Sequence, residues 1–461
     1  MEQAKRSQTR RQFLKTTSRI AASSALVGTA VPFVHAAENN TLQLALIGCG
    51  HRGTGAVANA LHVKRVPIKL VAMADVFEDR LNASYNNLKR FGDKIDVPKD
   101  RRFIGFDAYK KAMDCLRPGD IAIFTTPLAF RWVHFTYAIE KGLHVFMEKP
   151  LTADGPTTRR MIELAKKADQ KKLKVGVGLM SRHSRALQEL ADRIHNGELG
   201  EIICMRGYRM TGPIGSAFSE RWPGKPSELL WQIRRFHSFI WASGGCFNDF
   251  YIHIIDHSCW MKNAWPVKAQ ALGGRHYKTS PKGNPYVDQN FDSYAVEYTF
   301  PDGTKLFMDG RCMAGCLPMY YSYIHGTKGS AIGSKHGDCG LPSSIYKGQQ
   351  PDKTKLVWTS KVPPDQRNPY DNEWDDLVDA IVDDKPYNEV ERGAMASLVS
   401  SLGRFAAHTG QEVTLEELLN SKREYAPNVD KFTFNSLPPV KCDADGRYPI
   451  PMPGMLGKRE Y

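Results

Sequence analysis

Glycines and one acid early in the chain have the spacing needed to hold an adenine dinucleotide. Gly48-Cys49-Gly50-His51-Arg52-Gly53 follows the apolar run Leu42–Ile47, and Asp75 ends a second apolar run, 22 residues after Gly53. The first glycine of such a turn permits a tight bend, the second lets the backbone approach a pyrophosphate, and the third lets a helix pack closely. The N-terminus of that helix then faces the negative phosphates.

The acid at the end of the second run predicts which dinucleotide is bound. Asp75 can accept hydrogen bonds from ribose hydroxyls and repel a 2′-phosphate, so the sequence favours NAD over NADP. Arg52 stands inside the turn and could meet a phosphate, which tempers this preference. The glycine pattern alone is a weak signal, but two flanking strands and the acid make it specific. The residues expected to bind the coenzyme are therefore Gly48, Gly50, His51, Arg52, Gly53 and Asp75.

Alternating apolar runs and helical patterns up to about residue 180 predict the elements that carry this turn. Strands are expected at Leu42–Ile47, Ile68–Ala74, Ile121–Thr125, His144–Glu148 and Lys174–Leu179. Helices are expected near Thr54–His62, Arg131–Lys141 and Gly155–Gln170. Repeated strand–helix alternation predicts a doubly wound parallel sheet with its binding crevice at the carboxyl ends of the strands. Thr125-Thr126-Pro127 and Glu148-Lys149-Pro150 each follow such an end, so both should face the crevice.

After residue 200 the pattern changes to longer β-type runs. These are Glu201–Met210, Val267–Gly273, Ser293–Phe300 and Lys305–Gly310, with Pro301-Asp302-Gly303 as a hairpin turn between the last two. We expect a large, mostly antiparallel open sheet here, so that the fold class is α/β followed by α+β. Helical patterns return near Asn372–Asp383 and Arg392–His408, and the tail from Pro427 onward is rich in Pro and Gly.

Paired arginines near the N-terminus indicate an export signal. Thr9-Arg10-Arg11-Gln12-Phe13-Leu14-Lys15 precedes a mildly apolar stretch from Ile20 to Val34, and Ala36-Ala37 closes it. A basic region, a short apolar region and an Ala-type cleavage site form a secretory signal too short to span a bilayer. Arg-Arg before Phe-Leu-Lys resembles a twin-arginine signal, which predicts a periplasmic protein with no membrane span in its mature form. The alternative is a basic tail on a cytoplasmic protein.

Length and composition agree with a soluble enzyme, and charge and cysteine usage exclude little beyond that. The chain has 461 residues and a net charge of +14; without its first 36 residues, 57 basic and 48 acidic residues remain, or +9. This excess is spread along the chain, so nothing beyond charge supports nucleic-acid binding, and an acidic substrate would be equally consistent. The nine cysteines are scattered without a C-x-x-C pair. Cys312 and Cys316 lack partners at zinc spacing, so no metal site is predicted.

Taken in order, several motifs resemble the Gfo/Idh/MocA family of glucose–fructose oxidoreductase, inositol dehydrogenase and relatives. They are the glycine turn, Asp75, Thr126-Pro127, Glu148-Lys149-Pro150 and Gly245-x3-Asp249-x3-His253-x2-Asp256. The resemblance covers nearly all of the chain from about residue 41. It implies an NAD(P)-dependent oxidoreductase that acts on a hydroxyl or carbonyl of a sugar, cyclitol or related polyol. It also implies homo-oligomers formed through the open sheet of the second domain.

The resemblance assigns roles to particular residues. Lys149 matches the catalytic lysine, while Asp249 and His253 match the acid and histidine of the second domain. A lysine beside the reacting oxygen can steady negative charge, and a histidine can take the hydroxyl proton. Asp249 and His253 are four residues apart, so a helix would place them on one face. The remaining coenzyme contacts expected from the resemblance are Thr125, Thr126, Pro127, Glu148 and Lys149.

Two features depart from, or extend, the family pattern. Many relatives carry a histidine five residues after the threonine of Thr-Pro, where this chain has Arg131, so a positive group is expected to replace a polar contact. Arg182, His183 and Asp256 are weaker predictions for substrate contacts. The expected organisation is a signal peptide at 1–37, a Rossmann NAD-binding domain at 38–180, an α+β substrate and oligomerisation domain at 181–425, and a tail at 426–461.

Export of a dehydrogenase raises the question of how its coenzyme is recycled. Because NAD is regenerated in the cytoplasm, we expect the coenzyme to be retained and regenerated within each catalytic cycle. One route oxidises one sugar and reduces another; the alternative is a glycoside hydrolase that oxidises transiently, eliminates the aglycone, adds water and reduces again. A third interpretation, from a different class, is a binding or sensor protein that keeps NAD without using it.

Overall fold

A six-stranded parallel sheet carries the glycine turn. The computed structural model describes residues 40–335, 337 and 341–461. The strand order is β3-β2-β1-β4-β5-β6, and every neighbouring pair is parallel. The strands are β1 (Leu42–Ile47), β2 (Ile68–Asp75), β3 (Arg102–Ile104), β4 (Ile121–Phe124), β5 (His144–Met147) and β6 (Val175–Val177). The reversal of order between β1 and β4 places the crevice at their carboxyl ends.

Helices cover both faces of this sheet because its strands are apolar on both sides. One face, including Ala122 and Phe124, packs on α4 (Ala108–Met113), α5 (Arg131–Lys141) and α6 (Gly155–Gln170). The other face packs on α2 (His51–Ala60), α3 (Glu78–Leu88) and α11 (Pro369–Val382), with residues from those helices in one apolar cluster. The sequence-predicted Leu42–Ile47, Arg131–Lys141 and Gly155–Gln170 are confirmed residue for residue. The first helix begins three residues earlier than expected, directly after Gly50.

The second sheet has nine strands in the order β14-β13-β12-β11-β7-β10-β9-β8-β15. Among these strands β7 and β10 form the one parallel pair, so the sheet is mostly antiparallel, as predicted. The strands are β7 (Ile202–Thr211), β8 (Lys268–Gly274), β9 (Ser293–Thr299), β10 (Lys305–Cys312), β11 (Met319–Gly326), β12 (Gly329–Ser334), β13 (Ser344–Lys347), β14 (Leu356–Thr359) and β15 (Val413–Thr414). The predicted hairpin at Pro301-Asp302-Gly303 joins β9 to β10, with Gly303 at φ 86°.

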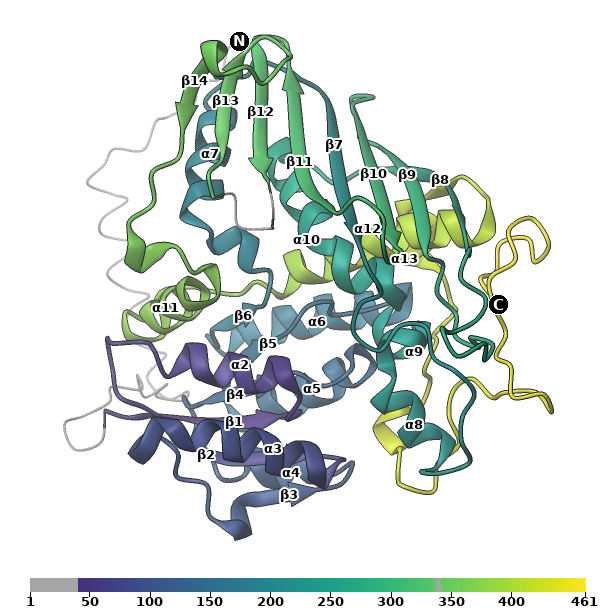
Figure 1. The fold of residues 1–461 in the computed structure, drawn as a ribbon. Coiled ribbons are helices and arrows are strands. Elements are labelled where there is room, and N and C mark those ends of the chain that lie inside the picture. The colour runs from purple at the N-terminus through teal and green to yellow at the C-terminus, as the bar shows by residue number, and fades with distance from the viewer. Residues whose placement is uncertain (1–39, 336, 338–340) are drawn as a thin grey trace, which may run out of the picture. The chain divides into compact units, whose positions relative to one another are not determined.

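One face of the second sheet is covered by α10 (Gly245–Lys262) and α12 (Val390–Thr409) (Figure 1). Helix α10 is buried on almost all sides, which is why it shows little separation of polar and apolar faces. Two glycines let it approach the strands. A Cβ at Gly207 would lie 2.5 Å from Ile254, and one at Gly310 would lie 2.0 Å from the Tyr251 ring. The other helices of this half are α7 (Arg185–His195), α8 (Glu228–Arg234), α9 (Ile240–Ser243) and α13 (Leu415–Asn420).

The opposite face of the second sheet is exposed and partly apolar. Ile203 on β7, Leu272 on β8 and Phe307 on β10 have 56%, 79% and 40% of their surface exposed. Alternation along β10 between buried and exposed residues is what a half-buried strand requires. The sheet therefore offers an uncovered apolar surface in the chain as described.

The tail runs along the surface but ends in a buried anchor. The Glu460 carboxylate accepts two hydrogen bonds from Arg404, at 2.9 and 3.1 Å, and one from His408 at 2.8 Å. It also accepts one from the Tyr425 hydroxyl. Arg404 and Glu460 side chains are both 0% exposed. Burial alone would raise the pKa of Glu460, but the Arg404 charge and the His408 hydrogen bond outweigh it and lower the pKa.

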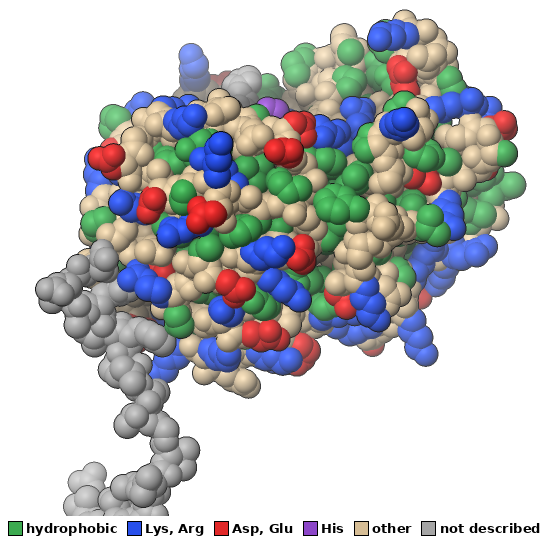
Figure 2. All heavy atoms as spheres, turned by 90° about the horizontal axis from the view of Figure 1, so that it is seen from below, with side chains coloured by type: hydrophobic (Ala, Val, Ile, Leu, Met, Phe, Trp, Pro, Cys, Tyr) green, Lys and Arg blue, Asp and Glu red, His purple; other side chains and the backbone are tan. Residues whose placement is uncertain are grey.

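Residues 41–461 form one compact unit, and the predicted signal peptide at 1–37 lies outside the described residues. None of the described helices combines the length and the apolar character that crossing a bilayer requires. On the face shown in Figure 2, basic and acidic side chains are interspersed and do not gather by sign. The net positive charge is therefore not concentrated on this face.

Candidate active site

A cavity of about 790 Å³ opens at the carboxyl ends of β1, β2, β4 and β5 and continues against residues of the second sheet and α10. Most of the residues that the sequence singled out line it. These are Gly48, Gly50, His51, Arg52, Gly53, Asp75, Thr125, Thr126, Pro127, Glu148, Lys149, Asp249 and His253. The structure thus brings together residues of the two halves of the chain, the nearest of which, Lys149 and Asp249, lie 100 positions apart in the sequence.

The glycine turn has the close backbone contacts that a dinucleotide cradle requires. Gly48 has φ 97°, and a Cβ there would lie 2.8 Å from the backbone of Thr125 and Thr126. A Cβ on Gly53 would lie 2.2 Å from the Gly48 carbonyl oxygen. Gly50 is the N-cap of the ten-residue helix α2, and no side chain caps the first N–H groups of this helix. Gly50 and the first residues of α2 line the cavity, so this helix N-terminus faces it. These features fit a pyrophosphate.

Asp75 is held at the end of β2 by the same turn. One carboxylate oxygen accepts a hydrogen bond from the Cys49 N–H at 2.6 Å, and the other accepts one from the Phe77 N–H at 2.8 Å. Burial raises the pKa of Asp75 above its ordinary value, although these two N–H groups oppose the rise. A carboxylate has about four acceptor sites, so both oxygens remain able to accept from ribose hydroxyls.

Arg52 lines the cavity as predicted, and its guanidinium also has protein partners. Its guanidinium forms ion pairs with Glu148 and, at 3.3 Å, with Glu373, and it stacks over the Tyr370 ring at 4.6 Å. Burial would lower the pKa of Arg52, but the two glutamates raise it instead. Arg52 is thus paired with Glu148, which directly follows β5, and with Glu373 of α11. No spacing in the sequence links Arg52 to Glu373.

Arg131 also corrects the expectation that a positive group replaces a polar contact. The buried guanidinium donates to the carbonyl oxygens of Phe124, at 2.6 Å, and Thr126, at 3.1 Å, so it braces the end of β4. The histidine expected near the threonine is supplied one turn later: His134 Nδ1 lies 3.3 Å from the Thr126 hydroxyl. Burial, aided by the Arg131 charge, lowers the pKa of His134 to about 3, so this imidazole is neutral.

Lys149 and Asp249 meet across the cavity. The Lys149 ammonium donates to the backbone carbonyl of Asp249 at 2.5 Å and lies 3.4 Å from its carboxylate. Both side chains are largely buried, with 14% and 11% of their surface exposed. Burial would raise the pKa of Asp249, but the charge of Lys149 and a hydrogen bond from His237 outweigh it and lower the pKa. Asp249 is therefore a carboxylate at neutral pH.

His237 belongs to this cluster and was not identified from the sequence. Its Nε2 lies 3.1 Å from the second carboxylate oxygen of Asp249, and its Nδ1 accepts from the Ser216 N–H at 3.1 Å. Because Nδ1 is occupied as an acceptor, the ring proton resides on Nε2 and is donated to Asp249. No sequence signal marked His237, which lies in a three-residue 3₁₀ helix, Phe236–Ser238, between α8 and α9.

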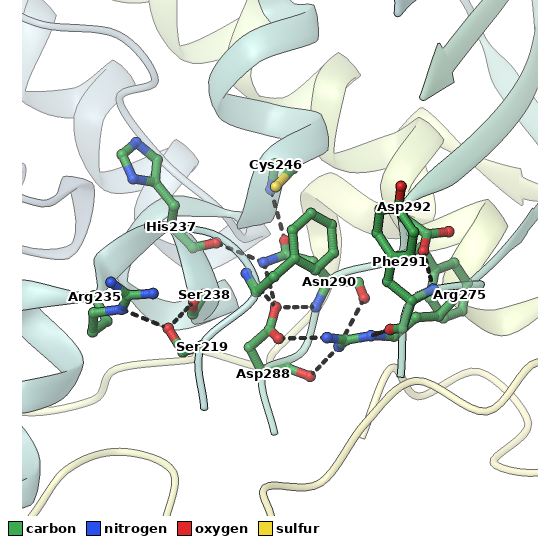
Figure 3. A network of polar contacts seen from close by, with 12 residues as sticks. Ser219, Arg235, His237, Ser238, Cys246, Arg275, Asp288, Asn290, Phe291 and Asp292 are labelled. Carbon is green, nitrogen blue, oxygen red and sulfur yellow. Dashed lines mark hydrogen bonds and ion pairs between the residues drawn. The ribbon is translucent and has the colours of Figure 1, made fainter. Parts of the chain in front are cut away.

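A buried network of polar side chains holds the backbone of His237 in place (Figure 3). The Asn290 side-chain amide donates to the His237 carbonyl at 2.9 Å, and its oxygen accepts from the Cys246 N–H at 2.8 Å. Asp288 accepts from Asn290 at 2.9 Å and from Arg275 at 2.7 Å. One amide therefore ties the His237 segment to the first turn of α10, which carries Asp249. In Figure 3 the His237 ring points away from the network that holds its backbone.

His253 follows Asp249 by one turn of α10, so the predicted shared helix face is confirmed. His253 is 7% exposed and lines the same cavity as Lys149 and Asp249. Phe250 lies between these groups. Its ring is 5.9 Å from the Lys149 ammonium and stacks on the His237 ring at 5.2 Å. The cavity wall here combines an ammonium, a carboxylate and two imidazoles around one aromatic ring.

The three weaker substrate predictions lie elsewhere. Arg182 makes a bidentate pair with Asp256, at 2.8 and 2.9 Å, and neither lines the cavity. His183 lies between Asp376 at 2.7 Å and Glu389 at 3.3 Å. Burial would lower the pKa of His183, but the two carboxylates raise it to about 9. These residues join α10, α11 and the start of α12, and we do not retain them as substrate contacts.

The arrangement is suited to moving a proton while a hydride leaves carbon. When bound, a nicotinamide coenzyme supplies the hydride acceptor. A substrate hydroxyl beside Lys149 can accept a hydrogen bond from its ammonium, which stabilises negative charge on that oxygen. Asp249 holds the ammonium in place, and His253 offers an imidazole on the same face that can accept the hydroxyl proton. The described residues therefore contain the positioning and acid–base groups that alcohol oxidation needs.

Comparison with known proteins gives relatives of one kind. Inositol 2-dehydrogenase of Corynebacterium glutamicum is 29% identical over 118 residues, which cover 25% of this chain and 34% of that protein. D-Glucoside 3-dehydrogenase of Escherichia coli is 24% identical over 322 residues, 68% of this chain and 80% of that protein. The chain thus matches about a third of the length of the first relative. No protein-family model matches the chain.

Solved structures show the same fold. Scyllo-inositol dehydrogenase of Lactobacillus casei, with NAD(H) and scyllo-inositol bound, is 19% identical with a TM-score of 0.58, covering 82% of this chain and 99% of its own. Aldose–aldose oxidoreductase of Caulobacter crescentus is 18% identical with a TM-score of 0.60, covering 81% and 99%. The relatives and structural neighbours of this chain are therefore inositol and sugar dehydrogenases of Gfo/Idh/MocA type, and the chain shares their two-domain fold.

Proposed function

We propose that this protein is an NAD-dependent oxidoreductase acting on a hydroxyl or carbonyl of a sugar, cyclitol or related polyol. The observation that carries the proposal is the meeting of Lys149 and Asp249 in a cavity that begins at the glycine turn. A binding protein that kept NAD without using it would have no need of a buried ammonium–carboxylate pair beside His253. Relatives named as inositol and glucoside dehydrogenases support this substrate class.

NAD is proposed over NADP because Asp75 stands at the end of β2. Its carboxylate would repel a 2′-phosphate, and Arg52 is paired with Glu148 and Glu373. The neighbour with NAD(H) bound is consistent with this preference. Equilibrium titration with NADH and NADPH, followed by coenzyme fluorescence, tests the choice: a tighter NADPH complex would refute it.

We also propose that the coenzyme is retained between turnovers. Arg234 at the end of α8 makes a bidentate ion pair with Asp79 of α3, both bonds at 2.8 Å, and its guanidinium lies 4.2 Å from the Phe77 ring. Phe77 and Arg234 both line the cavity, so this pair links the two halves of the chain over the coenzyme end. Denaturing the purified protein and identifying the released nucleotide tests retention; a protein purified free of nucleotide would refute it.

The central experiment is a turnover screen of inositols, aldoses and aryl glycosides with the purified protein and its Lys149→Met variant. We expect NADH absorbance to rise with a polyol, or one sugar to be oxidised while another is reduced. Removing one donor that stabilises developing negative charge costs about 10²–10³ in kcat, so turnover by Lys149→Met should fall by about that much while NADH still binds. Release of an aglycone without added NAD would instead favour the redox-neutral glycosidase. Wild-type turnover in Lys149→Met would refute the site.

Export and self-association are separate proposals. The twin-arginine motif at Arg10-Arg11 supports a periplasmic location, which cell fractionation of the wild type and a paired Arg→Lys variant at these positions would test. The exposed apolar residues Ile203, Leu272 and Phe307 on one face of the second sheet support a homo-oligomer formed there. Sedimentation of the wild type against Leu272→Glu tests it: a monomeric wild type would refute the proposal.

A further inference from the structure

The order of strands in the first sheet separates the coenzyme end of the cavity from the substrate end. Asp75 lies at the end of β2, the glycine turn after β1, and Thr126 and Lys149 at the ends of β4 and β5. A dinucleotide anchored at Asp75 and at the turn therefore runs toward Lys149. The cavity beyond Lys149 is lined by Asp249, Phe250 and His253 of α10, so this is where a substrate has room.

Arg209 of β7 stands at this substrate end. Gly207 and Arg209 are two residues apart on one strand, so they share the face that packs on α10. Gly207 lies against Ile254, one helical turn after Phe250, and Gly310, the partner of Arg209 in β10, lies against Tyr251. Arg209 is thus at the level of Phe250, and it lines the cavity.

The charge of Arg209 is not neutralised within the described part of the chain. Its guanidinium stacks on the Tyr320 ring at 3.9 Å, and its Nε is buried without a hydrogen-bond partner among the described residues. By contrast, Arg52, Arg182 and Arg404 each pair with a carboxylate. A half-buried guanidinium that lacks a counter-charge and lines a cavity is well placed to bind an anionic ligand.

Arg235 places a second positive charge on the same wall. It lies two residues before His237, and its Nε donates to the Ser219 hydroxyl at 2.7 Å, a neutral partner (Figure 3). Burial lowers the pKa of Arg235, and the charges of Asp288 and Glu220 only partly oppose this. Lys149 is balanced by Asp249, so Arg209 and Arg235 leave the substrate end with excess positive charge.

We propose that the substrate is an acidic sugar or polyol, such as a uronate, whose carboxylate binds Arg209. This rests on the proposed function and names the substrate class for the same site. The oxidised hydroxyl would lie beside Lys149 while the carboxylate reaches the guanidinium across Phe250. Arginine presents paired N–H donors that match a carboxylate, and the stacked Tyr320 ring restrains the guanidinium in its plane.

We expect discrimination against a neutral sugar because it would leave the half-buried Arg209 cation without a counter-charge. Sites built to bond a polar substrate group reject analogues lacking it by up to about 10⁴–10⁵ in kcat/KM. Arg209 is only partly buried, so we expect kcat/KM for a uronate to exceed that for the matching neutral sugar by about 10²-fold, mainly through KM.

The experiment compares each uronate with its neutral counterpart: D-glucuronate with D-glucose, and D-galacturonate with D-galactose. The methyl glycosides of these sugars are compared in the same pairs. It uses the wild type, Arg209→Met, Arg209→Lys and the control Arg206→Met. Arg206 lies on the same strand and also stacks over a β11 tyrosine, Tyr323 at 5.1 Å, but it is exposed on the opposite face. Methionine keeps the aliphatic stem against Tyr320 while removing the charge.

In the wild type and in Arg206→Met we expect the uronate to be preferred by about 10²-fold, as in the estimate above. Arg209→Met should bring the ratio close to one, and Arg209→Lys should give an intermediate value. Equal turnover of uronates and neutral sugars by the wild type, or an unchanged ratio in Arg209→Met, would overturn the acidic-substrate proposal alone. No turnover of either sugar class, with NADH bound, would instead count against the proposed function. If the variants do not fold, the affinity of the wild type for a uronate, measured by calorimetry, tests the acidic-substrate proposal instead.

Discussion

Replacing Gly53 by alanine tests the coenzyme cradle most directly. Ordinary van der Waals contacts of a Cβ begin at 3.4 Å, whereas a Cβ on Gly53 would lie 2.2 Å from the Gly48 carbonyl oxygen and 2.5 Å from the Thr125 hydroxyl. The hydroxyl can rotate, but the carbonyl belongs to the turn itself. Helix α2 must therefore move away from β1, or the turn must change shape.

The magnitude follows from this overlap of more than 1 Å. Overpacking of a well-packed contact costs about 1–3 kcal/mol of stability. A displaced helix N-terminus also loses part of its contact with the pyrophosphate. If 1.4–2.8 kcal/mol of that interaction is lost, NADH affinity falls by about 10- to 100-fold. We expect both effects in Gly53→Ala.

Gly55→Ala provides the matched control in the same helix. A Cβ there would meet only Arg52 Nη1, at 3.2 Å, a contact that a shift of a few tenths of an ångström relieves. Alanine is favoured over glycine within a helix by about 0.8–1 kcal/mol, so this variant should be as stable as the wild type or more so. NADH fluorescence titration and urea unfolding measure both quantities. Wild-type affinity and stability in Gly53→Ala would refute the argument from close packing.

Four further outcomes are expected. Asp249→Asn should lower kcat by about 10²-fold without loss of NADH binding, since Lys149 loses its counter-charge, as steady-state kinetics can show. Arg404→Met should lower the free energy of unfolding by about 3–5 kcal/mol in urea, because it leaves the Glu460 carboxylate buried without its counter-charge. The folded-state pKa of Glu460 is lowered, so its stabilisation is complete above its unfolded pKa of about 4.3 and is lost as pH falls further; Glu460→Gln should flatten that acid limb of stability. The folded-state pKa of His183 is raised to about 9, so its stabilisation is complete below its unfolded pKa of about 6.5 and is lost as pH rises toward 9; an unchanged alkaline limb in His183→Gln would contradict this.

The first sheet could be predicted from sequence because its strands are short, continuous apolar runs with turn residues between them. Leu42–Ile47 and Arg131–Lys141 agree with the structure at both ends. The edge strand β3 and the strands β11 to β14 were not predicted. Gly329–Ser334 is rich in Gly and Ser, so its strand conformation depends on pairing with β11 and β13 more than on its own propensity.

The site residues also divide into those that a local motif marks and those that only the fold brings into place. Lys149 and Asp249 were found because each stands in a local motif, and their 100-residue separation is closed only by the fold. His237 was missed because nothing local marks it: its position depends on Ser216 and Asn290. Arg182 was predicted to contact substrate, but the structure pairs it with Asp256 away from the cavity.

The sequence alone determined the coenzyme turn, the acid at the end of β2 and the α/β order, because each depends on neighbours within about thirty residues. Tertiary structure decided which charged side chains form ion pairs with one another and which face the cavity without a charged partner among the described residues. Arg52 is neutralised by Glu373, whereas Arg209 has no carboxylate partner among the described residues. Ion pairing depends on distances across the fold, and side-chain identity along the chain does not contain those distances.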